Sequence, residues 1–263
     1  MHIAVCVKQV PDTTEVKINP ETGTLIRTGV PSIINPYDHF ALQTAMGLKK
    51  LHGCRVTVIS MGPPQARSVV QMGMALGADD GVLLSDMAFA GSDTWATSYA
   101  LAKAVKKLGK VDLILAGMQA IDGDTAQTGP GMAQQLGIPQ VSFCEKIDLD
   151  GRKLIARRLI DGGYEIVEVK VPALFTMIMP RDYVPVYPAF LETHASLKKP
   201  YYVWSAADIG AEPRYLGLKG SPTQVARIYP PQQREKAAMT GGSAQEAAEK
   251  ILEIMRKEHF IAE

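Results

Sequence analysis

The amino-acid sequence predicts an α/β fold: a mostly parallel β-sheet with helices on both faces, an antiparallel extension, and an extended C-terminal arm that ends in a helix. Short β-branched apolar segments alternate with longer segments of helical periodicity through residue 143, which is typical of parallel strands joined by helical crossovers. After Val141 the spacing of apolar residues becomes that of strands alone, and from about Pro185 prolines interrupt the chain repeatedly. We therefore expect one folded domain over residues 1–185 and a second region over residues 186–263.

The first half of the chain contains four expected strands, each followed by a helix. The strands are His2–Lys8, Arg55–Met61, Val82–Leu84 and Val111–Ala116. Residues that favour helix ends mark the helices. Asn35–Pro36 begins the first, Gly77 ends the second, Ser92 or Asp93 begins the third and Gly109 ends it, and Gly137 with Pro139 ends the fourth. A small hairpin of Glu15–Ile18 and Thr24–Arg27 is expected before the first helix, because the turn-rich segment NPETG separates these two segments.

Three further strands are expected after Val141. They are Lys153–Ile160, Tyr164–Val171 and Ala173–Met179, with a hairpin turn at Gly162–Gly163. We expect all three to extend the sheet in antiparallel fashion. The arm from residue 186 is rich in proline and is not expected to form a core of its own. Its last element, Ala244–Arg256, is an amphipathic helix that is expected to lie on another protein surface.

Composition excludes several classes of function. The net charge is +1 and no run of lysine and arginine is long, which disfavours nucleic-acid binding. The three cysteines stand far apart without a CxxC motif, so this chain alone is not expected to hold a metal. No segment approaches the roughly 20 apolar residues of a membrane span, and the N-terminus lacks the basic region of a signal peptide. We expect a cytoplasmic protein without membrane insertion.

The familiar phosphate-binding and catalytic motifs are missing. GxGxxG fails at Gly129–Gly131, because Gln134 stands where the third glycine belongs, and GxxxxGK[ST], GxSxG and HExxH do not occur. A conventional NAD-type dehydrogenase and a P-loop NTPase are therefore disfavoured. The five histidines are scattered along the chain. We expect no residue to act as a catalytic acid, base or nucleophile.

The segment Gly117–Pro130 (GMQAIDGDTAQTGP) is the most informative part of the sequence. It follows a buried strand and precedes a helix, so it lies at the carboxyl edge of the sheet, where open α/β folds bind ligands. Thr125, Thr128 and the first N–H groups of the helix can hold a phosphate, and Asp122 and Asp124 can accept from ribose hydroxyls or cap the helix. From the residues alone, nucleotide binding and a capped loop with nothing bound remain open alternatives.

Several longer segments identify a family. VCVKQVPDT (Val5–Thr13), NPYDHFALQTA (Asn35–Ala45), VISMGPPQA (Val58–Ala66), ALGAD (Ala75–Asp79), DLILAGMQAIDGDTAQTGP (Asp112–Pro130) and IDGGYE (Ile160–Glu165) occur in the order and spacing of electron-transfer flavoprotein β subunits. The resemblance covers nearly all of residues 1–183, and GLKGSPTQV (Gly217–Val225) extends it. It implies an adenine-nucleotide-binding, Rossmann-like fold and a partner α subunit that carries FAD.

The resemblance also implies site residues. Carried over by position, the cofactor contacts fall on Cys6, Asn35, Pro36, Tyr37, Asp38, Met61, Gly117, Met118, Gln119, Ala120, Ile121, Asp122, Gly123, Asp124, Thr125, Ala126, Gln127, Thr128 and Gly129. Glu165, next to the hairpin turn, is expected to pair with a cation on the α subunit.

The family has two branches that differ in this loop. One holds AMP as a structural ligand and typically reads DDDCNQTGQ. The other holds a second FAD and typically reads DGDTAQVGP, which the present DGDTAQTGP resembles. The second branch takes electrons from NADH and bifurcates them, to ferredoxin or flavodoxin and, through the α-subunit FAD, to an acceptor dehydrogenase. An AMP-holding β subunit is the first alternative. A nucleotide-using enzyme of similar fold is the second, although its signatures SGGxDS and HxGH do not occur.

Two departures from the family pattern bear on function. Met118 stands where the family usually has lysine or arginine. In this family the segment after the antiparallel strands serves to recognise the acceptor, an acyl-CoA dehydrogenase-like or other flavin dehydrogenase, and here that segment reads VPVYPAFLETHASLKKP from Val184. Tyr187 is retained there, and Phe190 and Leu191 fill the apolar anchor position. These three residues are expected to bind the dehydrogenase; the alternative is that Phe190 and Leu191 pack on the antiparallel strands.

Overall fold

A computed structural model describes residues 1–12, 31–226 and 242–261 of the protein. The chain divides into two compact units, Met1–Ala226 and Arg227–Glu263. The hairpin expected from Glu15–Ile18 and Thr24–Arg27 lies outside the described residues.

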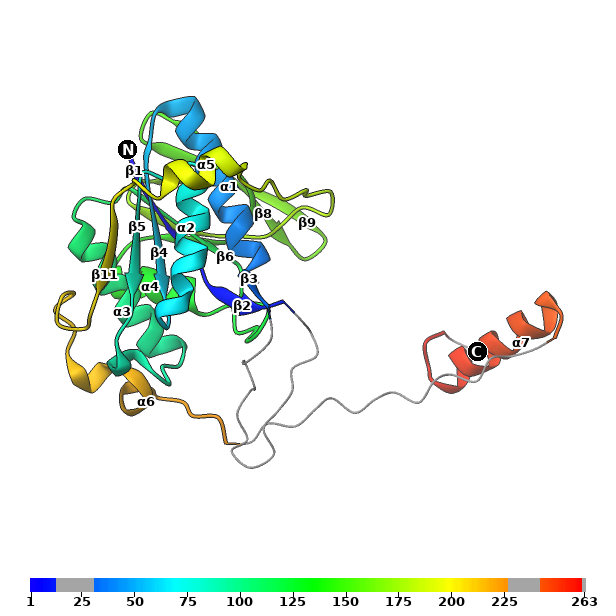
Figure 1. The fold of residues 1–263 in the computed structure, drawn as a ribbon. Helices are drawn as coiled ribbons and strands as arrows, with labels where there is room; N and C mark the ends of the chain where they lie inside the picture. Colours follow the sequence, from blue (N-terminus) through cyan, green and yellow to red (C-terminus); the bar gives the residue numbers. More distant parts are fainter. Residues whose placement is uncertain (13–30, 227–241, 262–263) are drawn as a thin grey trace. The chain divides into compact units, whose positions relative to one another are not determined.

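The first unit is built on one large sheet, which is mostly parallel as predicted (Figure 1). Among the described residues its strand order is β11-β5-β4-β1-β6-β10-β7-β8-β9. The bounds are β1 His2–Cys6, β4 Arg55–Met61, β5 Asp80–Leu84, β6 Leu113–Gly117, β7 Gln140–Asp150, β8 Lys153–Ile160, β9 Gly163–Lys170, β10 Ala173–Met177 and β11 Tyr201–Trp204. Two short strands, β2 Gln9–Pro11 and β3 Ser32–Ile34, form a separate antiparallel pair. All pairs from β11 to β7 are parallel, and β8 and β9 follow in antiparallel fashion.

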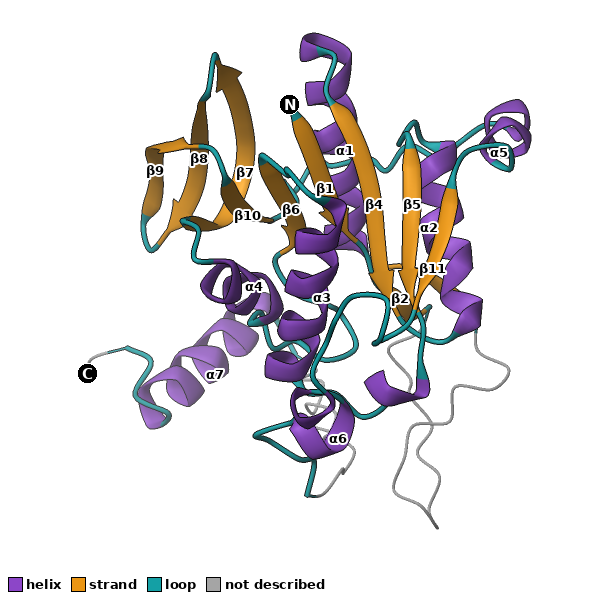
Figure 2. Cartoon of the chain, turned by 90° about the vertical axis from the view of Figure 1, so that its left-hand side faces the viewer, coloured by secondary structure: helices purple, strands orange, loops and turns teal. Residues whose placement is uncertain are grey.

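Helices cover both faces of this sheet. Their bounds are α1 Pro36–His52, α2 Arg67–Ala75, α3 Thr94–Leu108, α4 Thr128–Leu136, α5 Phe190–Ser196 and α6 Gly217–Gly220. Figure 2 shows α1 and α2 on one face and α3 and α4 on the other. The alternation along β1 explains the two cores, because Ile3 and Val5 belong to the α1–α2 core and Ala4 and Cys6 to the α3–α4 core.

The ends of α3 and α4 confirm the capping chemistry predicted from the sequence. Asn35 precedes α1 as predicted but makes no side-chain capping hydrogen bond, and α2 ends at Ala75, two residues before Gly77. Asp93 is the N-cap of α3 and accepts a hydrogen bond from the Ala96 N–H (3.0 Å). Gly109 ends that helix, and Gly137 ends α4 in the left-handed conformation, with a φ of 66°. The strands Arg55–Met61 and Lys153–Ile160 have the predicted bounds.

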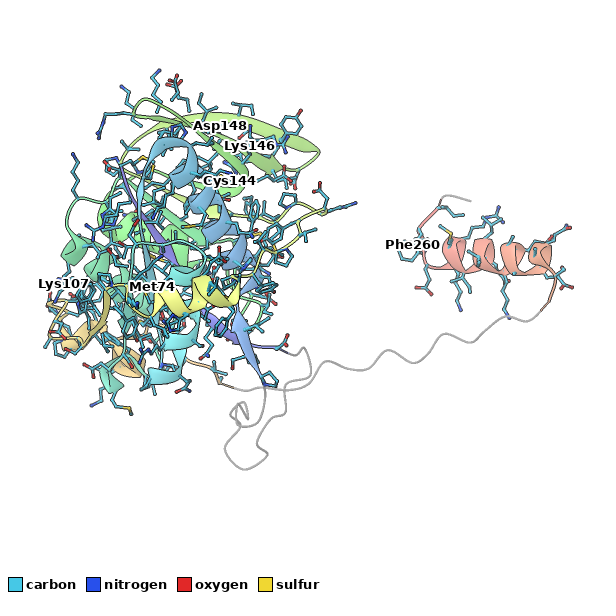
Figure 3. The ribbon with its side chains drawn as sticks, turned by 45° about the horizontal axis from the view of Figure 1, so that its top comes forward. Met74, Lys107, Cys144, Lys146, Asp148 and Phe260 are labelled. Atoms are coloured by element: carbon cyan, nitrogen blue, oxygen red, sulfur yellow. The ribbon has the colours of Figure 1, made fainter. Side chains whose placement is uncertain are left out.

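The sequence predicts that Ala173–Met179 extends the sheet in antiparallel fashion, and this prediction is wrong. The strand observed there, β10 Ala173–Met177, lies inside the sheet. The Ala173 N–H donates to the Asp112 carbonyl (3.2 Å), which starts β10 beside β6, and the two strands run parallel. All five residues of β10 are buried, as expected for a strand covered on both faces. The sequence prediction also missed β7, which pairs with β10 on one side and β8 on the other. On β7 the exposed pair Lys146–Asp148 (2.8 Å) is labelled in Figure 3.

Part of the proline-rich region belongs to the first unit. Tyr201–Trp204 forms β11, which pairs with β5, and Ile209 and Leu216 are buried in the α3–α4 core. The described prolines of this region (Pro185, Pro188, Pro200, Pro213 and Pro222) lie outside the strands, where they interrupt no strand hydrogen bond. The first unit therefore continues to Ala226, past the boundary expected at residue 185.

The second unit contains the predicted C-terminal helix, α7 Ala244–Lys257. A capping box begins it: the Glu246 carboxylate accepts from the Ser243 N–H (2.7 Å), and the Ser243 hydroxyl accepts from the Glu246 N–H (3.3 Å). The side chains of Ile251, Leu252 and Ile254 are exposed. Within the described residues, no helix has the length and apolar character that a membrane span requires.

Candidate functional site

The candidate site lies where the order of strands reverses. The chain passes from β1 to β4 and β5 on one side, then crosses to β6 on the other side of β1. Open α/β folds bind ligands outside the carboxyl ends of strands at such a switch point. Three predicted site residues end strands of this edge: Cys6 ends β1, Met61 ends β4 and Gly117 ends β6. The predicted residues Asn35, Pro36, Tyr37 and Asp38 form the start of α1 at the same edge.

Asn35 binds the loop that follows β6. Its side chain is fully buried. The amide Nδ2 donates to the Gln119 carbonyl (2.8 Å), and Oδ1 accepts from the Ile121 N–H (3.2 Å). The Asn35 N–H donates to the Lys8 carbonyl (2.9 Å). Asn35 therefore joins the end of β1 to the start of the loop.

Asp38 makes a second connection between the same two segments. One carboxylate oxygen accepts from the Lys8 N–H (2.8 Å) and the other from the Gly117 N–H (2.9 Å). Burial nevertheless raises the pKa of Asp38 to about 7, and these hydrogen bonds oppose that rise. A Cβ on Gly117 would overlap the Asp38 carboxylate and the Cβ of Tyr37, so only glycine allows this approach.

The loop from Met118 to Gln127 carries further internal contacts and local strain. Lys8 Nζ forms an ion pair with Asp122 (2.6 Å), and Gln119 Nε2 donates to Asp124 (2.7 Å). Asp124 and Ala126 have positive φ values of 49° and 54°. Such conformations cost on the order of 1 kcal/mol for residues other than glycine and cluster at ligand sites. Gly123, Asp124, Thr125 and Gln127 are exposed, whereas Met118, Ala120 and Ala126 are half-buried.

The start of α4 presents backbone N–H groups to this edge. Thr128 and Gly129 form its first turn, followed by Pro130, and the unpaired N–H groups and helix dipole of such a turn favour an anion. A Cβ on Gly129 would lie 2.5 Å from Thr176 Cγ2, and one on Gly131 would lie 2.7 Å from Ser98 Oγ. Both glycines therefore let α4 pack closely on β10 and α3.

Cys6 offers no reactive group to the site. Its thiol lies in the α3–α4 core, 3.9 Å from the Met132 sulfur, and burial raises its pKa to about 12. A ligand would meet Cys6 through its backbone. Nor do three or more His, Cys, Asp or Glu side chains gather anywhere in the described ranges in a way that could hold a metal ion.

Three polar residues of this edge, Lys8, Thr94 and Asp93, were not predicted as site residues from the sequence, although Asp93 was predicted as a helix cap. Lys8 lies two residues after the end of β1, and this position after a buried strand was the sequence feature that could have indicated it. Thr94 donates to the Gln127 side chain (2.9 Å), which joins the loop to α3. Asp93 accepts from both the N–H (2.9 Å) and the hydroxyl (2.7 Å) of Thr223, so the segment after α6 also reaches the start of α3.

The expected partner-binding residues lie apart from this edge. Phe190 and Leu191 begin α5 and are 81% and 77% exposed, so they do not pack on the antiparallel strands. The Tyr187 ring is exposed as well and stands 5.3 Å from the ring of His39 on α1. Val184 and Val186 are exposed too, so this short segment carries five exposed apolar or aromatic side chains. It is here called the docking segment (Val184–Leu191).

Glu165 lies on β9 opposite Arg158 of β8. The carboxylate and the guanidinium are 3.9 Å apart, and both side chains are partly exposed. Within this chain, the positively charged group next to Glu165 is therefore the guanidinium of Arg158.

Comparison with known proteins identifies the family. Residues 22–208 match the electron transfer flavoprotein domain. The chain is 49% identical over 261 residues to electron transfer flavoprotein subunit beta of Clostridium acetobutylicum, covering 99% of this chain and 100% of that protein. It is 46% identical to caffeyl-CoA reductase-Etf complex subunit CarD of Acetobacterium woodii, covering 99% and 100%. It is 43% identical to protein FixA of Azorhizobium caulinodans, covering 98% and 95%. The chain belongs to the electron transfer flavoprotein family, as one of its β subunits.

Proposed function

We propose that this β subunit binds FAD at the switch point and, with its α subunit, takes electrons from NADH and sends them in two directions. One electron would pass to ferredoxin or flavodoxin, and the other through the α-subunit FAD to an acceptor dehydrogenase. The observation that carries the proposal is the segment DGDTAQTGP (Asp122–Pro130), which continues from the loop after β6 into the first turn of α4. Its residues Gly123–Thr125 and Gln127 are exposed, and Asp124 and Ala126 have positive φ values.

The residues at this edge fit a diphosphate. The first turn of α4 supplies N–H groups, and the Thr128 hydroxyl stands beside them. Lys8 supplies a cation close to the loop, since its ammonium group reaches Asp122. Nothing lies within 4 Å of the position of a Cβ on Gly123, so that side of the loop is open. Gly123 and Ala126 also add neither charge nor bulk next to a ligand with two phosphates.

In this proposal the residues of this chain would bind the FAD and orient it. Asn35 and Asp38 use their polar side-chain atoms within the protein, so we assign them to holding the loop rather than to contacting the ligand. Loop residues 118–128 would make the ligand contacts. FAD, when bound there, would accept the hydride of NADH and release its electrons singly.

An AMP-holding β subunit is the second candidate. The observation that favours it is Met118, which leaves the loop without the basic side chain expected near a second phosphate. In that case the nucleotide would stabilise the loop between β6 and α4, and the α-subunit flavin alone would carry electrons.

The proposed electron acceptor is an acyl-CoA dehydrogenase-like flavin dehydrogenase that binds the docking segment. Its exposed apolar residues are suited to a protein interface. Two relatives bear names that join them to acyl-CoA reductases: CarD of the caffeyl-CoA reductase-Etf complex, and acryloyl-CoA reductase electron transfer subunit gamma of Anaerotignum propionicum, which is 41% identical to this chain.

NADH titration of the αβ heterodimer without any dehydrogenase tests the proposal. We expect NADH to bleach the flavin absorbance of the wild-type heterodimer. Thr128→Leu should abolish this response and deplete the β-site ligand, because a bulky apolar side chain at the helix start displaces the diphosphate. An unchanged response in the Thr128→Leu heterodimer would contradict this assignment of the site.

A further inference from the structure

The first two turns of α1 bind two segments that are distant in the sequence. Asn35 and Asp38 hold the loop residues 117–121, as described above. The next residues along the same helix bind the docking segment and Tyr183, the residue before it. His39 Nδ1 lies 2.6 Å from the Tyr183 hydroxyl, and Gln43 Nε2 donates to the Val186 carbonyl (3.4 Å).

His39 is the central contact of this second group. It is only 2% exposed, and its ring packs against those of both Tyr183 and Tyr187, at 6.2 and 5.3 Å. Phe40 adds an edge-on contact with Tyr183 at 5.0 Å. Burial lowers the pKa of His39 and raises that of Tyr183, so both groups stay neutral near pH 7 and the hydrogen bond between them persists.

The two groups of contacts are adjacent in the chain. Asp38 binds Gly117 and His39 binds Tyr183, so consecutive residues of one helix make both contacts, and a rigid element of this kind can carry coupling between two sites. A second connection runs beside it: the Met118 N–H donates to the Met177 carbonyl (2.8 Å) at the end of β10, six residues before Tyr183. The nucleotide loop and the docking segment thus share α1 and the end of β10 as common supports.

We infer that His39 is a positioning residue that fixes the docking segment to α1, and that nucleotide binding in the loop after β6 thereby orders the surface that receives the dehydrogenase. This inference rests on the proposed function for the role of the docking segment, but not on whether the nucleotide is FAD or AMP. A ligand that holds residues 117–128 also restrains the first turn of α1, which binds that loop, and through it the docking segment. An ordered docking segment then loses less conformational freedom when it binds the dehydrogenase. By thermodynamic linkage, binding of the dehydrogenase should raise the affinity of the β subunit for its nucleotide by the same factor by which the nucleotide raises its affinity for the dehydrogenase.

Hydrogen–deuterium exchange of the αβ heterodimer tests the coupling. The heterodimer is stripped of nucleotide and compared with itself after incubation with FAD and, separately, with AMP. With the nucleotide that it binds, we expect slower exchange both in residues 117–128 and in residues 180–191. Equal exchange in residues 180–191 with and without bound nucleotide would overturn the inference, whichever nucleotide protects the loop.

Variants of His39 separate positioning from general stability. His39→Leu should keep the nucleotide-dependent protection of residues 117–128 and lose that of residues 180–191. His39→Asn should restore it, because an asparagine amide can reach the position of Nδ1. The exposed His52 at the other end of α1 provides the matched control, and His52→Leu should behave as wild type. If His39→Leu does not fold, Tyr183→Phe removes only the hydroxyl partner and should give the same loss in weaker form.

Kinetics with an acyl-CoA dehydrogenase provides the functional readout. His39→Leu should raise the KM for the heterodimer by about 10-fold, within the usual range of coupling between sites, with kcat and nucleotide content unchanged. A loss of nucleotide with an unchanged KM would instead make His39 part of the nucleotide site and overturn the inference. An AMP-only heterodimer that still shows the coupling would refute the FAD proposal and leave this inference standing.

Discussion

At the scale of single residues, the polar side chains of the switch point divide by exposure. Asn35 and Asp38 are buried, and their side chains hydrogen-bond to backbone groups of β1 and of the loop after β6. Lys8 and most of the loop side chains are partly or fully exposed. The buried pair therefore sets the shape of the site, and the exposed residues are the ones that a nucleotide can contact.

Asp38 should give the protein a characteristic pH dependence. Its pKa is raised in the folded state, so the folded chain binds a proton that the unfolded chain has released between about pH 4 and pH 7. Stability from this group is therefore fully present at low pH and declines as pH rises through that window. We expect the unfolding free energy of wild type, relative to Asp38→Asn, to fall from pH 4 to pH 7 and to level off above it. Denaturant unfolding at several pH values measures this difference, and a flat difference would contradict the assignment.

Lys8 should contribute to nucleotide affinity more than to stability. The Lys8 side chain is 47% exposed and that of Asp122 is 11% exposed. Water around the ammonium group screens the ion pair and keeps its contribution to about 1 kcal/mol, whereas a hydrogen bond from an ammonium group to a phosphate contributes about 1.5–3 kcal/mol. Lys8→Met should weaken nucleotide retention by about 10-fold or more and make it less sensitive to salt, with little change in unfolding. Equilibrium dialysis at two salt concentrations tests this. Lys50→Met, at an exposed position of α1, is the control and should retain nucleotide as wild type does.

At the scale of elements, the packing of α4 depends on glycine. Since a Cβ on Gly129 would lie 2.5 Å from Thr176 Cγ2, Gly129→Ala must shift α4 away from β10. We expect a loss of about 1–3 kcal/mol in unfolding free energy, typical of overpacking, together with reduced nucleotide content. Gly47→Ala, in α1 with open space around it, should instead stabilise the protein by about 0.5–1 kcal/mol. Thermal unfolding of both variants measures these changes in stability. Equal changes in the two variants would contradict the close packing of α4 on β10.

The element α5 carries the proposed anchor for the dehydrogenase. Phe190→Ala should slow electron delivery to an acyl-CoA dehydrogenase without altering flavin content or stability, because the ring is 81% exposed. Stopped-flow reduction of the dehydrogenase measures the rate. Leu197→Ala removes another exposed apolar side chain at the end of the same helix and should leave the rate unchanged. A rate that falls equally in both variants would indicate a general effect of α5 rather than an anchor.

The elements also show which features of the fold and site could be predicted. Helix ends were predicted because capping is local: Asp93, Gly109 and Gly137 act on groups within a few residues. The placement of β10 was not predicted, because it depends on contacts between residues distant in the sequence. Ala173 bonds to Asp112, and β10 pairs with β6, about 60 residues earlier in the chain. The loop of the site was predicted from its position after a strand. The roles of Asn35 and Asp38 were not, because their partners lie 79 to 86 residues away.

At the scale of the whole molecule, the β subunits of this family pair with an α subunit. Two described apolar surfaces suit protein partners: the docking segment and the exposed side of α7 with Ile251, Leu252 and Ile254. In the proposed function the docking segment would bind the dehydrogenase. We propose that α7 binds the α subunit, since an amphipathic helix with no buried residue of its own needs a second surface to cover its apolar side. The site between β6 and α4 would then hold the flavin that supplies both electron paths.

The nucleotide content of the purified αβ heterodimer tests this central claim most directly. The protein is denatured, and the released nucleotides are separated, identified by mass spectrometry and counted per heterodimer. We expect two FAD and no AMP. One FAD with one AMP would contradict the claim and would make this chain a β subunit whose nucleotide serves only to stabilise the fold.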